Sequence, residues 1–288
     1  MADRFDKLAT GNNNWSSVNT WKATTGGATG ASVPTSSDNV YVNADSCAAG
    51  ATLTVDATGY CLAMDWRGAG ATNTPTLDFS TNYLVSYGDI TFIGAMTISA
   101  RSGYTMYPRG VSNFTTAGQT IPGGIAINNA VSVITLLDSL TCGYLIQTKG
   151  GLDTNGQTLT ATDGIGIVES GADAKTLTTG SSVISCVLWS YTGTNLTMAA
   201  NTATINCSGD FNGGDIATYN IVNLTGATST ISGSNTFAEL NGDPAITQTL
   251  TFTDGTTQTA TTFTLSGSAG HIHTLQGTGT AGWSLVQA

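Results

Sequence analysis

Apolar residues recur along the whole chain as single positions or short runs, separated by segments rich in Gly, Asn, Ser and Thr. The segment LTGATSTISGSNTFAEL (224–240) shows the pattern, with a few apolar residues spread among Thr and Ser. β-branched Thr favours strands, and Gly favours turns. The pattern therefore predicts an all-β protein made of many short strands.

Four segments repeat one arrangement, in which Leu, a short turn and a second apolar residue follow one another. They are LDTNGQTLTA (152–161), LTTGSSVISC (177–186), LTMAANTATINC (196–207) and LTGATSTISG (224–233). The second apolar residues are Leu159, Ile184, Ile205 and Ile231, at steps of 25, 21 and 26 residues. ITFIGAMTISA (90–100) is a weaker copy that places Ile98 at this position.

A degenerate repeat of this length fits one turn of a parallel β-solenoid, whose turns stack at about 4.8 Å. One turn cannot bury its apolar face alone, so stacking makes the core. We therefore predict a right-handed parallel β-helix. A string of antiparallel β-sandwiches needs similar turn spacing and is the alternative, but the mutual resemblance of the repeats favours the solenoid.

Small residues stand two positions after each of these apolar residues, on the same side of a strand. They are Ala100, Ala161, Cys186, Cys207 and Gly233. We expect them to form one narrow interior column, with Cys186 and Cys207 in adjacent turns. The two thiols are either free and stacked or a redox pair. The five cysteines are odd in number and lack CxxC spacing, which indicates reduced, buried residues.

The pattern divides the chain into three parts. Residues 1–36 are expected to form an N-terminal arm or cap, with a short helix or a disordered arm over 1–10 and with Trp15 and Trp21 over the open end of the solenoid. Residues 37–245 are expected to form the stacked turns. Residues 246–288 contain alternating strands with turns at DG and SG, which indicates a C-terminal β cap or oligomerisation module.

Composition narrows the possible partners. Charged residues make up only 9% of the 288 residues, and the net charge is −10. The eight Lys and Arg residues are scattered, so we expect no nucleic-acid binding. No apolar run approaches the roughly 20 residues of a membrane helix, and the N-terminus lacks the apolar region of a signal peptide. We therefore expect neither a membrane partner nor export.

One segment carries a family resemblance. NWSSVNTWKATTGGATGASVPTSSDNVYVNADS (14–46) resembles the N-terminal signature of β-helical structural proteins encoded by tailed bacteriophages, which includes a SVPTSxDNVxFDAxS element. GSNTFAEL and the closing FTLSG and GWSL segments are also similar to that group. RFDKLATG (4–11) stands where the family has an aromatic, glycine-rich start. The resemblance implies a virion protein made in the host cytoplasm, and it supplies no catalytic residues.

Solenoids of this class also host enzymes that cleave polysaccharides, which need paired carboxylates or a base beside Arg or Lys. The candidates are Asp65 with Arg67, Asp89, Arg101, Arg109 and Asp138. Asp65 and Arg67 share one face of a strand, and a solvated ion pair is a better interpretation of them than a sugar-cleaving site. The acids are sparse, so we expect no enzyme activity and no cofactor.

Two further binding sites are conceivable. Trp66 adjoins Asp65 and Arg67, and a glycan could stack on it together with the aromatic residues Tyr83, Tyr87, Trp189 and Tyr191. His271 and His273 would project from one strand face with the spacing of two metal ligands, although two exposed polar residues on a turn have the same pattern.

These features predict a non-enzymatic bacteriophage structural protein, most simply a capsid-surface decoration or head-fibre protein. Its expected partners are other capsid or tail proteins and copies of itself, with a trimer favoured. The alternative is a tail-associated fibre or spike that acts on a host surface glycan, with binding preferred over cleavage. A cellular adhesin is a third reading, which the missing export signal disfavours.

Overall fold

The computed structural model describes residues 2–43, 47–70, 72–79, 82–100, 103–168, 173–193, 195–214 and 218–288. Strands make up 53% of the chain, and their parallel sheets form a β-solenoid of about ten turns, which confirms the predicted fold class. Within the described ranges the helical elements are two short 3-10 helices, η1 (Val18–Thr20) and η2 (Arg67–Ala69). The chain divides into two compact units, Met1–Gly143 (unit 1) and Tyr144–Ala288 (unit 2).

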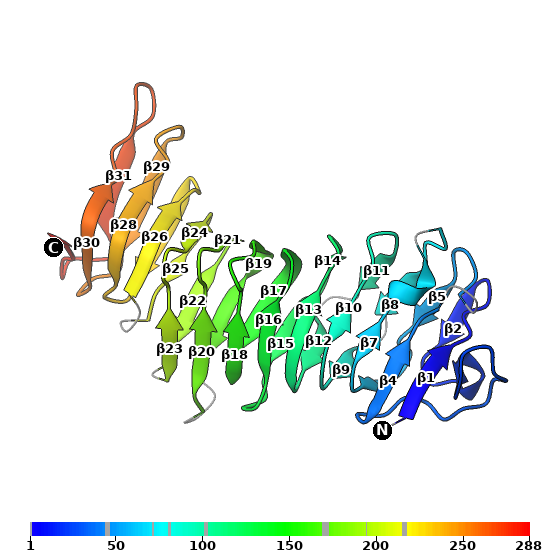
Figure 1. The fold of residues 1–288 in the computed structure, drawn as a ribbon. Helices are drawn as coiled ribbons and strands as arrows, with labels where there is room; N and C mark the ends of the chain where they lie inside the picture. Colours follow the sequence, from blue (N-terminus) through cyan, green and yellow to red (C-terminus); the bar gives the residue numbers. More distant parts are fainter. Residues whose placement is uncertain are drawn as a thin grey trace. The chain divides into compact units, whose positions relative to one another are not determined.

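Unit 1 winds through three strand lines, in each of which a strand pairs in parallel with strands of neighbouring turns (Figure 1). The first line contains β1 (Ala2–Asp6), β4 (Asp38–Tyr41), β7 (Met64–Asp65), β10 (Ile90–Thr91), β13 (Val111–Thr115) and β16 (Val133–Leu136). The second contains β2 (Asn12–Asn14), β5 (Thr52–Thr54), β8 (Thr76–Phe79) and β11 (Thr97–Ala100). The third contains β6 (Gly59–Cys61), β9 (Leu84–Ser86), β12 (Tyr104–Pro108) and β15 (Gly124–Ile127). The short β14 (Thr120–Ile121) pairs with the start of β17 (Leu140–Gln147).

The core of unit 1 is built from columns of side chains stacked in register. The first line stacks Val40, Met64, Ile90, Phe114 and Leu136, all buried. The second stacks Leu53, Leu77 and Ile98. In β5, Leu53 points inward between two outward Thr residues, as the period of two along a strand requires.

The first turn of unit 1 is covered by its own N-terminal segment. Residues 2–6 form β1, so the expected short helix or disordered arm over 1–10 is wrong. This stretch pairs in parallel with β4, from Ala2 with Asp38 to Phe5 with Tyr41. After η1, β3 (Trp21–Lys22) pairs antiparallel with β1 and covers its outer edge. Trp15 and Trp21 are buried edge to face at 5.0 Å, and Gly59 leaves room for the Trp15 ring.

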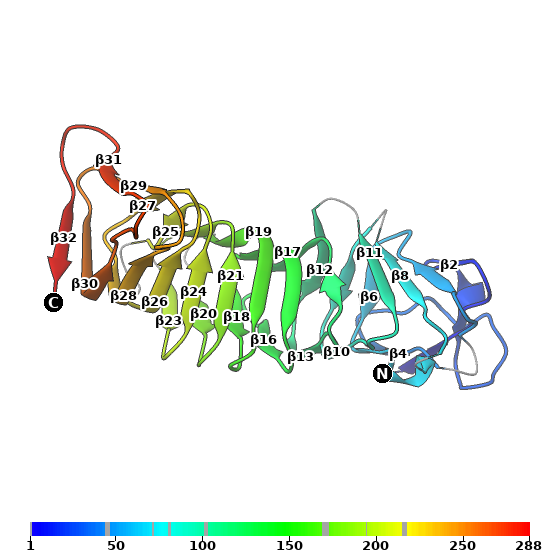
Figure 2. The ribbon, with the colours of Figure 1, turned by 90° about the horizontal axis from the view of Figure 1, so that it is seen from above.

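Unit 2 begins with three strand lines and continues with two (Figure 2). The first line contains β18 (Gly150–Asp153), β20 (Lys175–Thr178) and β23 (Leu196–Ala199). The second contains the start of β19 (Leu159–Val168), β21 (Val183–Cys186), β24 (Thr204–Cys207), β26 (Thr218–Leu224), β28 (Thr236–Gly242), β30 (Thr257–Thr264) and β32 (Ser284–Gln287). The third contains the end of β19, β22 (Trp189–Thr192), β25 (Phe211–Asn212), β27 (Thr228–Ser232), β29 (Gln248–Phe252) and β31 (His273–Gly277).

The predicted columns are found in part. Leu159, Ile184 and Ile205 pair in register, as do Ala161, Cys186 and Cys207. The next members are Val222 and Leu224.

Two predicted members of these columns are wrong: Ile231 pairs with Phe211 in the third line, and Gly233 follows β27 in a turn with positive φ. Ile98 and Ala100 lie in β11 of unit 1, where they pair with Leu77 and Phe79. The LTGATSTISG copy joins the second line to the third, because in the described chain the first line ends at β23. The earlier copies join the first line to the second.

The C-terminal segment continues the solenoid. Strands β29 to β32 pair in parallel with β27, β28, β29 and β30 respectively. The turn at Asp254–Gly255 therefore joins two strand lines instead of closing an antiparallel hairpin, and strand pairing does not change at residue 246. In Figure 2, β26, β28 and β30 lie side by side.

Side chains also tie neighbouring turns, and the two units use different groups. In unit 1 the carboxylates of Asp56, Asp89 and Asp138 accept backbone N–H groups of a neighbouring turn, from Ser16, Asn113 and Thr116. In unit 2 buried amides hold carbonyls of neighbouring turns. Gln248 donates to Leu224 O and Gly226 O and accepts from Asp243 N. Gln147 and Gln258 have similar roles.

Candidate functional site

The aromatic residues proposed as a glycan platform lie in the core. Trp66, Trp189 and Tyr191 have at most 1% of their surface exposed. The Trp189 Nε1–H donates to Tyr219 Oη at 3.2 Å, and the Tyr191 hydroxyl accepts from Leu196 N at 3.3 Å. Because their ring faces are covered, they cannot stack on a sugar, and this prediction is wrong. Tyr83 and Tyr87 are half-buried, and Tyr83 contacts Tyr107 with ring centroids 4.8 Å apart.

Asp65 and Arg67 form an ion pair at the end of β7. Arg67 Nη2 lies 2.6 Å from Asp65 Oδ2, and Nε donates to both carboxylate oxygens. Burial alone would raise the pKa of Asp65, but the hydrogen bonds from Arg67 outweigh it and hold that pKa below its usual value. A carboxylate held ionised in this way does not donate a proton at neutral pH. The Arg67 side chain is 73% exposed, so the pair is solvated.

The other acids considered for sugar cleavage hold the backbone in place. Asp89 accepts from Asn113 N at 2.7 Å, and Asp138 accepts from both Thr116 N and Ala117 N. Arg109 follows β12, and its Nε is buried. Arg101 lies outside the described residues. These contacts use the carboxylates as turn ties instead of bringing two acids together around a substrate.

The two histidines do not form a metal site. His273 Nδ1 lies 2.9 Å from Leu265 O, and Nε2 lies 3.0 Å from Asp243 O. Both ring nitrogens of His273 thus lie against backbone carbonyl oxygens, which leaves neither open to a metal ion, so the prediction of a His271–His273 metal pair is wrong. In the described part of the chain, no group of three or more His, Cys, Asp or Glu side chains can hold a metal ion.

The five cysteines are free and buried. Cys186 and Cys207 face each other in register on β21 and β24. Cys186 is 6% exposed and Cys207 is 0% exposed, so other thiols and oxidants have little access to the pair. Burial raises the pKa of Cys47 to about 12.

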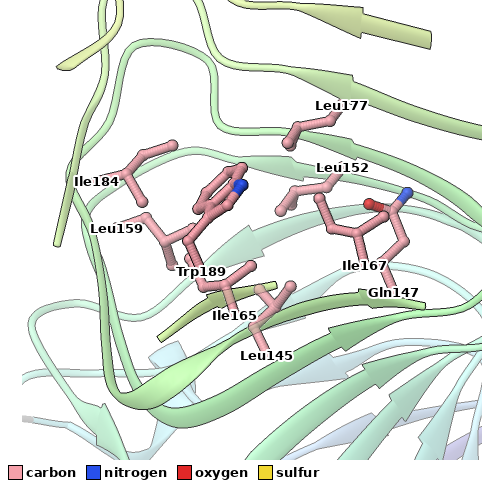
Figure 3. A pocket seen from close by; sticks show the side chains of 9 residues that line it. All are labelled: Leu145, Gln147, Leu152, Leu159, Ile165, Ile167, Leu177, Ile184 and Trp189. Atoms are coloured by element: carbon pink, nitrogen blue, oxygen red, sulfur yellow. The ribbon is translucent and has the colours of Figure 1, made fainter. Parts of the chain in front are cut away.

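One interior cavity of unit 2 has a volume of about 10 Å³. Figure 3 shows the side chains that line it, which are aliphatic apart from Trp189 and the amide of Gln147. A space of this size holds at most one water molecule. This cavity is therefore too small for an organic ligand.

A groove runs along the second strand line of unit 2, where the chain leaves these strands. Two adjoining hollows of about 350 and 260 Å³ share Thr225 and form what we call the axial groove. One wall is Thr160, Ser185, Asn206 and Asn223, which pair in register. The other lining residues are the buried Ala161, Cys186, Leu224 and Gly242 and, where the chain leaves the strands, Thr162, Val187, Ser208, Thr225, Asp243 and Pro244.

Amide side chains form a ladder along the first wall. Asn223 Nδ2 donates to Asn206 Oδ1 at 2.8 Å, and Asn241 Nδ2 donates to Asn223 Oδ1 at 3.1 Å. At one end, Gly242 admits the buried amide of Gln248 and the ring of His273, which a Cβ would meet at 2.7 and 2.8 Å.

Sequence reasoning missed this groove, although a signal exists. INCS, VNLT and LNGD repeat an apolar residue, Asn, a third residue and a polar residue, at intervals of 17 and 18 residues.

Searches of protein-family profiles, curated proteins and solved structures found no match to the chain. None of the helices in the described ranges has the length and apolar character needed to cross a membrane. The functional argument therefore depends on the residues and their geometry.

Proposed function

We propose that this chain is a non-enzymatic structural protein of a tailed-bacteriophage particle, and that it decorates the capsid surface as a homo-oligomer, with a trimer favoured. The resemblance of residues 14–46 to phage β-helical proteins motivates the proposal. Within this segment, Trp15, Trp21 and β3 cover the first turn of unit 1. Covering the end of a sheet prevents uncontrolled edge-to-edge pairing.

The in-register columns are the observation that best supports a structural role. Within each unit, apolar side chains continue from turn to turn, and carboxylates or amides bond neighbouring turns together. Each turn is thereby fixed to its neighbours, as in other repeat architectures. Of the candidate acids, Asp89 and Asp138 bond neighbouring turns, and Asp65 pairs with Arg67. These contacts favour scaffolding over catalysis.

Immunogold labelling of purified particles with an antibody against this chain tests the proposal. Gold over the heads is the expected result. Gold at the tail tip would replace the capsid role with the tail-fibre alternative. Particles without gold, together with chain recovered from the bacterial surface, would contradict a virion role and favour an adhesin.

A further inference from the structure

From the geometry of the axial groove we infer that unit 2 binds a neutral, extended polysaccharide along the stacking direction of its turns. This inference goes beyond the proposed virion role and does not depend on it. It concerns a site distinct from the buried aromatic residues, and it can be tested on the isolated chain.

The first argument is the hydrogen-bonding capacity of the asparagine ladder. A side-chain amide has two N–H donors and two acceptor lone pairs. The bond from Asn223 to Asn206 uses one donor of Asn223 and one lone pair of Asn206. Both residues are only half-buried. Each therefore keeps amide groups that can bond a ligand, and the hydroxyls of Ser185 and Thr160 continue the same wall.

The second argument is periodicity. Neighbouring turns stand about 4.8 Å apart, so the five turns from Thr160 to Asn241 present polar groups over about 19 Å. A ligand that uses several of them must be a chain with polar groups at a similar interval. An extended polysaccharide has one ring for each such interval and hydroxyl groups on every ring.

The third argument is the lining of the groove. Val187 is 46% exposed and lies among Ser185, Asn206 and Ser208, so the hollow offers an apolar contact beside polar side chains. A sugar ring has apolar C–H faces and a polar rim, so its C–H groups suit Val187 and its hydroxyls suit the neighbouring polar side chains. A peptide strand fits less well, because the backbone groups beside the groove are already paired. Ser208 N, for example, donates to Cys186 O, and Thr225 N donates to Cys207 O.

Charge selects the kind of polysaccharide. Unit 2 has two basic residues, Lys149 and Lys175, against nine acidic ones, which gives a net charge of −7. None of the residues that line the groove is basic, and Asp243 stands at one end. A polyanion such as a nucleic acid or an acidic capsule would be repelled. The fitting ligand is therefore uncharged.

Saturation-transfer NMR with linear neutral hexasaccharides of glucose and of N-acetylglucosamine tests the inference, with an alginate hexamer as the acidic comparison. We expect saturation transfer to at least one neutral hexamer and none to alginate. We also expect the disaccharide to bind at least tenfold more weakly, because it spans fewer turns. Absence of binding to every neutral hexamer at millimolar concentration would overturn the inference.

Three variants locate the site. Ser208→Trp places a bulky ring on an exposed lining position and should abolish binding. Thr197→Trp, an equally exposed position on β23 in the first strand line, should leave binding unchanged. Asn223→Leu should weaken binding about tenfold, the equivalent of one lost hydrogen bond. Thermal unfolding of each variant shows whether it is folded.

Equal binding by wild type and Ser208→Trp would place the glycan elsewhere and contradict the inference. A change in oligomeric state with Ser208→Trp, measured by sedimentation and without any glycan binding by the wild type, would identify the groove as a contact between copies and would also contradict it.

Discussion

Units 1 and 2 solve the same problem, the fixing of one turn to the next, with different chemistry. In unit 1 the polar ties are mainly carboxylates, such as Asp89 and Asp138, which accept backbone N–H groups. In unit 2 the buried ties are neutral amides, such as Gln248 and Gln258. Unit 2 also has carboxylate ties at Asp210 and Asp254, and the hydrogen bonds of these two are exposed, as is that of Asp89 in unit 1.

Because of this difference, we expect the stability of the two units to respond differently to acid. Asp38 and Asp65 both lie in unit 1, and both have a pKa below the usual value. For Asp38, hydrogen bonds from Thr35 and the charge of Arg4 outweigh the opposing effect of burial. A carboxyl with a lowered pKa stabilises the folded state above its unfolded pKa of about 3.9 and loses this contribution as pH falls through its folded pKa. An amide has no such dependence.

The largest expected effect comes from breaking an amide tie in unit 2. Gln248→Ala leaves Leu224 O, Gly226 O and Asp243 N without this partner. Each buried unpaired group costs about 1–3 kcal/mol, so we expect a loss of about 3 kcal/mol in the free energy of unfolding, measured by urea denaturation. Gln276→Ala, an exposed amide in β31, is the matched control and should change it by less than about 0.5 kcal/mol. Equal effects would show that the buried amides do not tie the turns.

In the wild-type protein, acid should destabilise unit 1 at a higher pH than unit 2. We expect amide-exchange protection in β4 and β7 to fall at a higher pH than protection in β24 and β26, because the lowered carboxyl pKa values belong to unit 1. Hydrogen exchange followed by mass spectrometry between pH 7 and pH 2.5 gives this order. Simultaneous loss in both units would indicate that the carboxylates of unit 1 have no special role.

Asp38→Asn tests one carboxylate directly. Asp38 Oδ2 accepts from Thr35 N at 2.9 Å and from Thr35 Oγ1 at 2.7 Å, and Arg4 lies 3.8 Å away. We expect a loss of about 1–2 kcal/mol at pH 7. The difference between variant and wild type should shrink as pH falls through the folded pKa of Asp38, because the wild-type carboxyl then becomes protonated and loses its charge. A difference that stays constant with pH would assign the effect to shape instead of charge.

Asp65→Asn should have the smallest effect. The Asp65–Arg67 geometry is good, but Arg67 is largely exposed, and pairs of this kind contribute about 0–1 kcal/mol. We expect less than about 0.5 kcal/mol in urea denaturation at 0.15 M salt. A loss above 2 kcal/mol would mean that the turn at η2 depends on this ion pair.

The fold could be predicted because the repeat is visible in the residues themselves. Leu159, Ile184 and Ile205 follow similar turns, and their spacing equals the length of one solenoid turn. The prediction failed at Ile231, because a local pattern of Leu, turn and apolar residue does not say which strand line it joins. Ile231 joins the third strand line because the first line ends at β23 in the described chain. No local residue pattern predicts this end.

The candidate site was less predictable for a related reason. Trp189 and Tyr191 stand two residues apart and share one face, but alternation alone does not reveal whether that face is inner or outer. In the structure this face is the inner one, and Trp189 packs against Phe211 and Tyr219 in the core. The groove arises from residues of five different turns, so it becomes visible only when their register is known.

The number of residues in one turn of the solenoid varies without changing the register of the strands. The column Leu159, Ile184, Ile205, Val222, Leu240 and Phe263 keeps its register although its steps range from 17 to 25 residues. The corners absorb every difference. A foreign peptide inserted at the exposed corner Asn201–Thr202 should therefore be displayed without disturbing the stack, whereas deletion of one residue inside β24 would turn its inner face outward. Inserted peptides can therefore be attached at the corners, and the regular spacing of the stacked strands sets the distance between them.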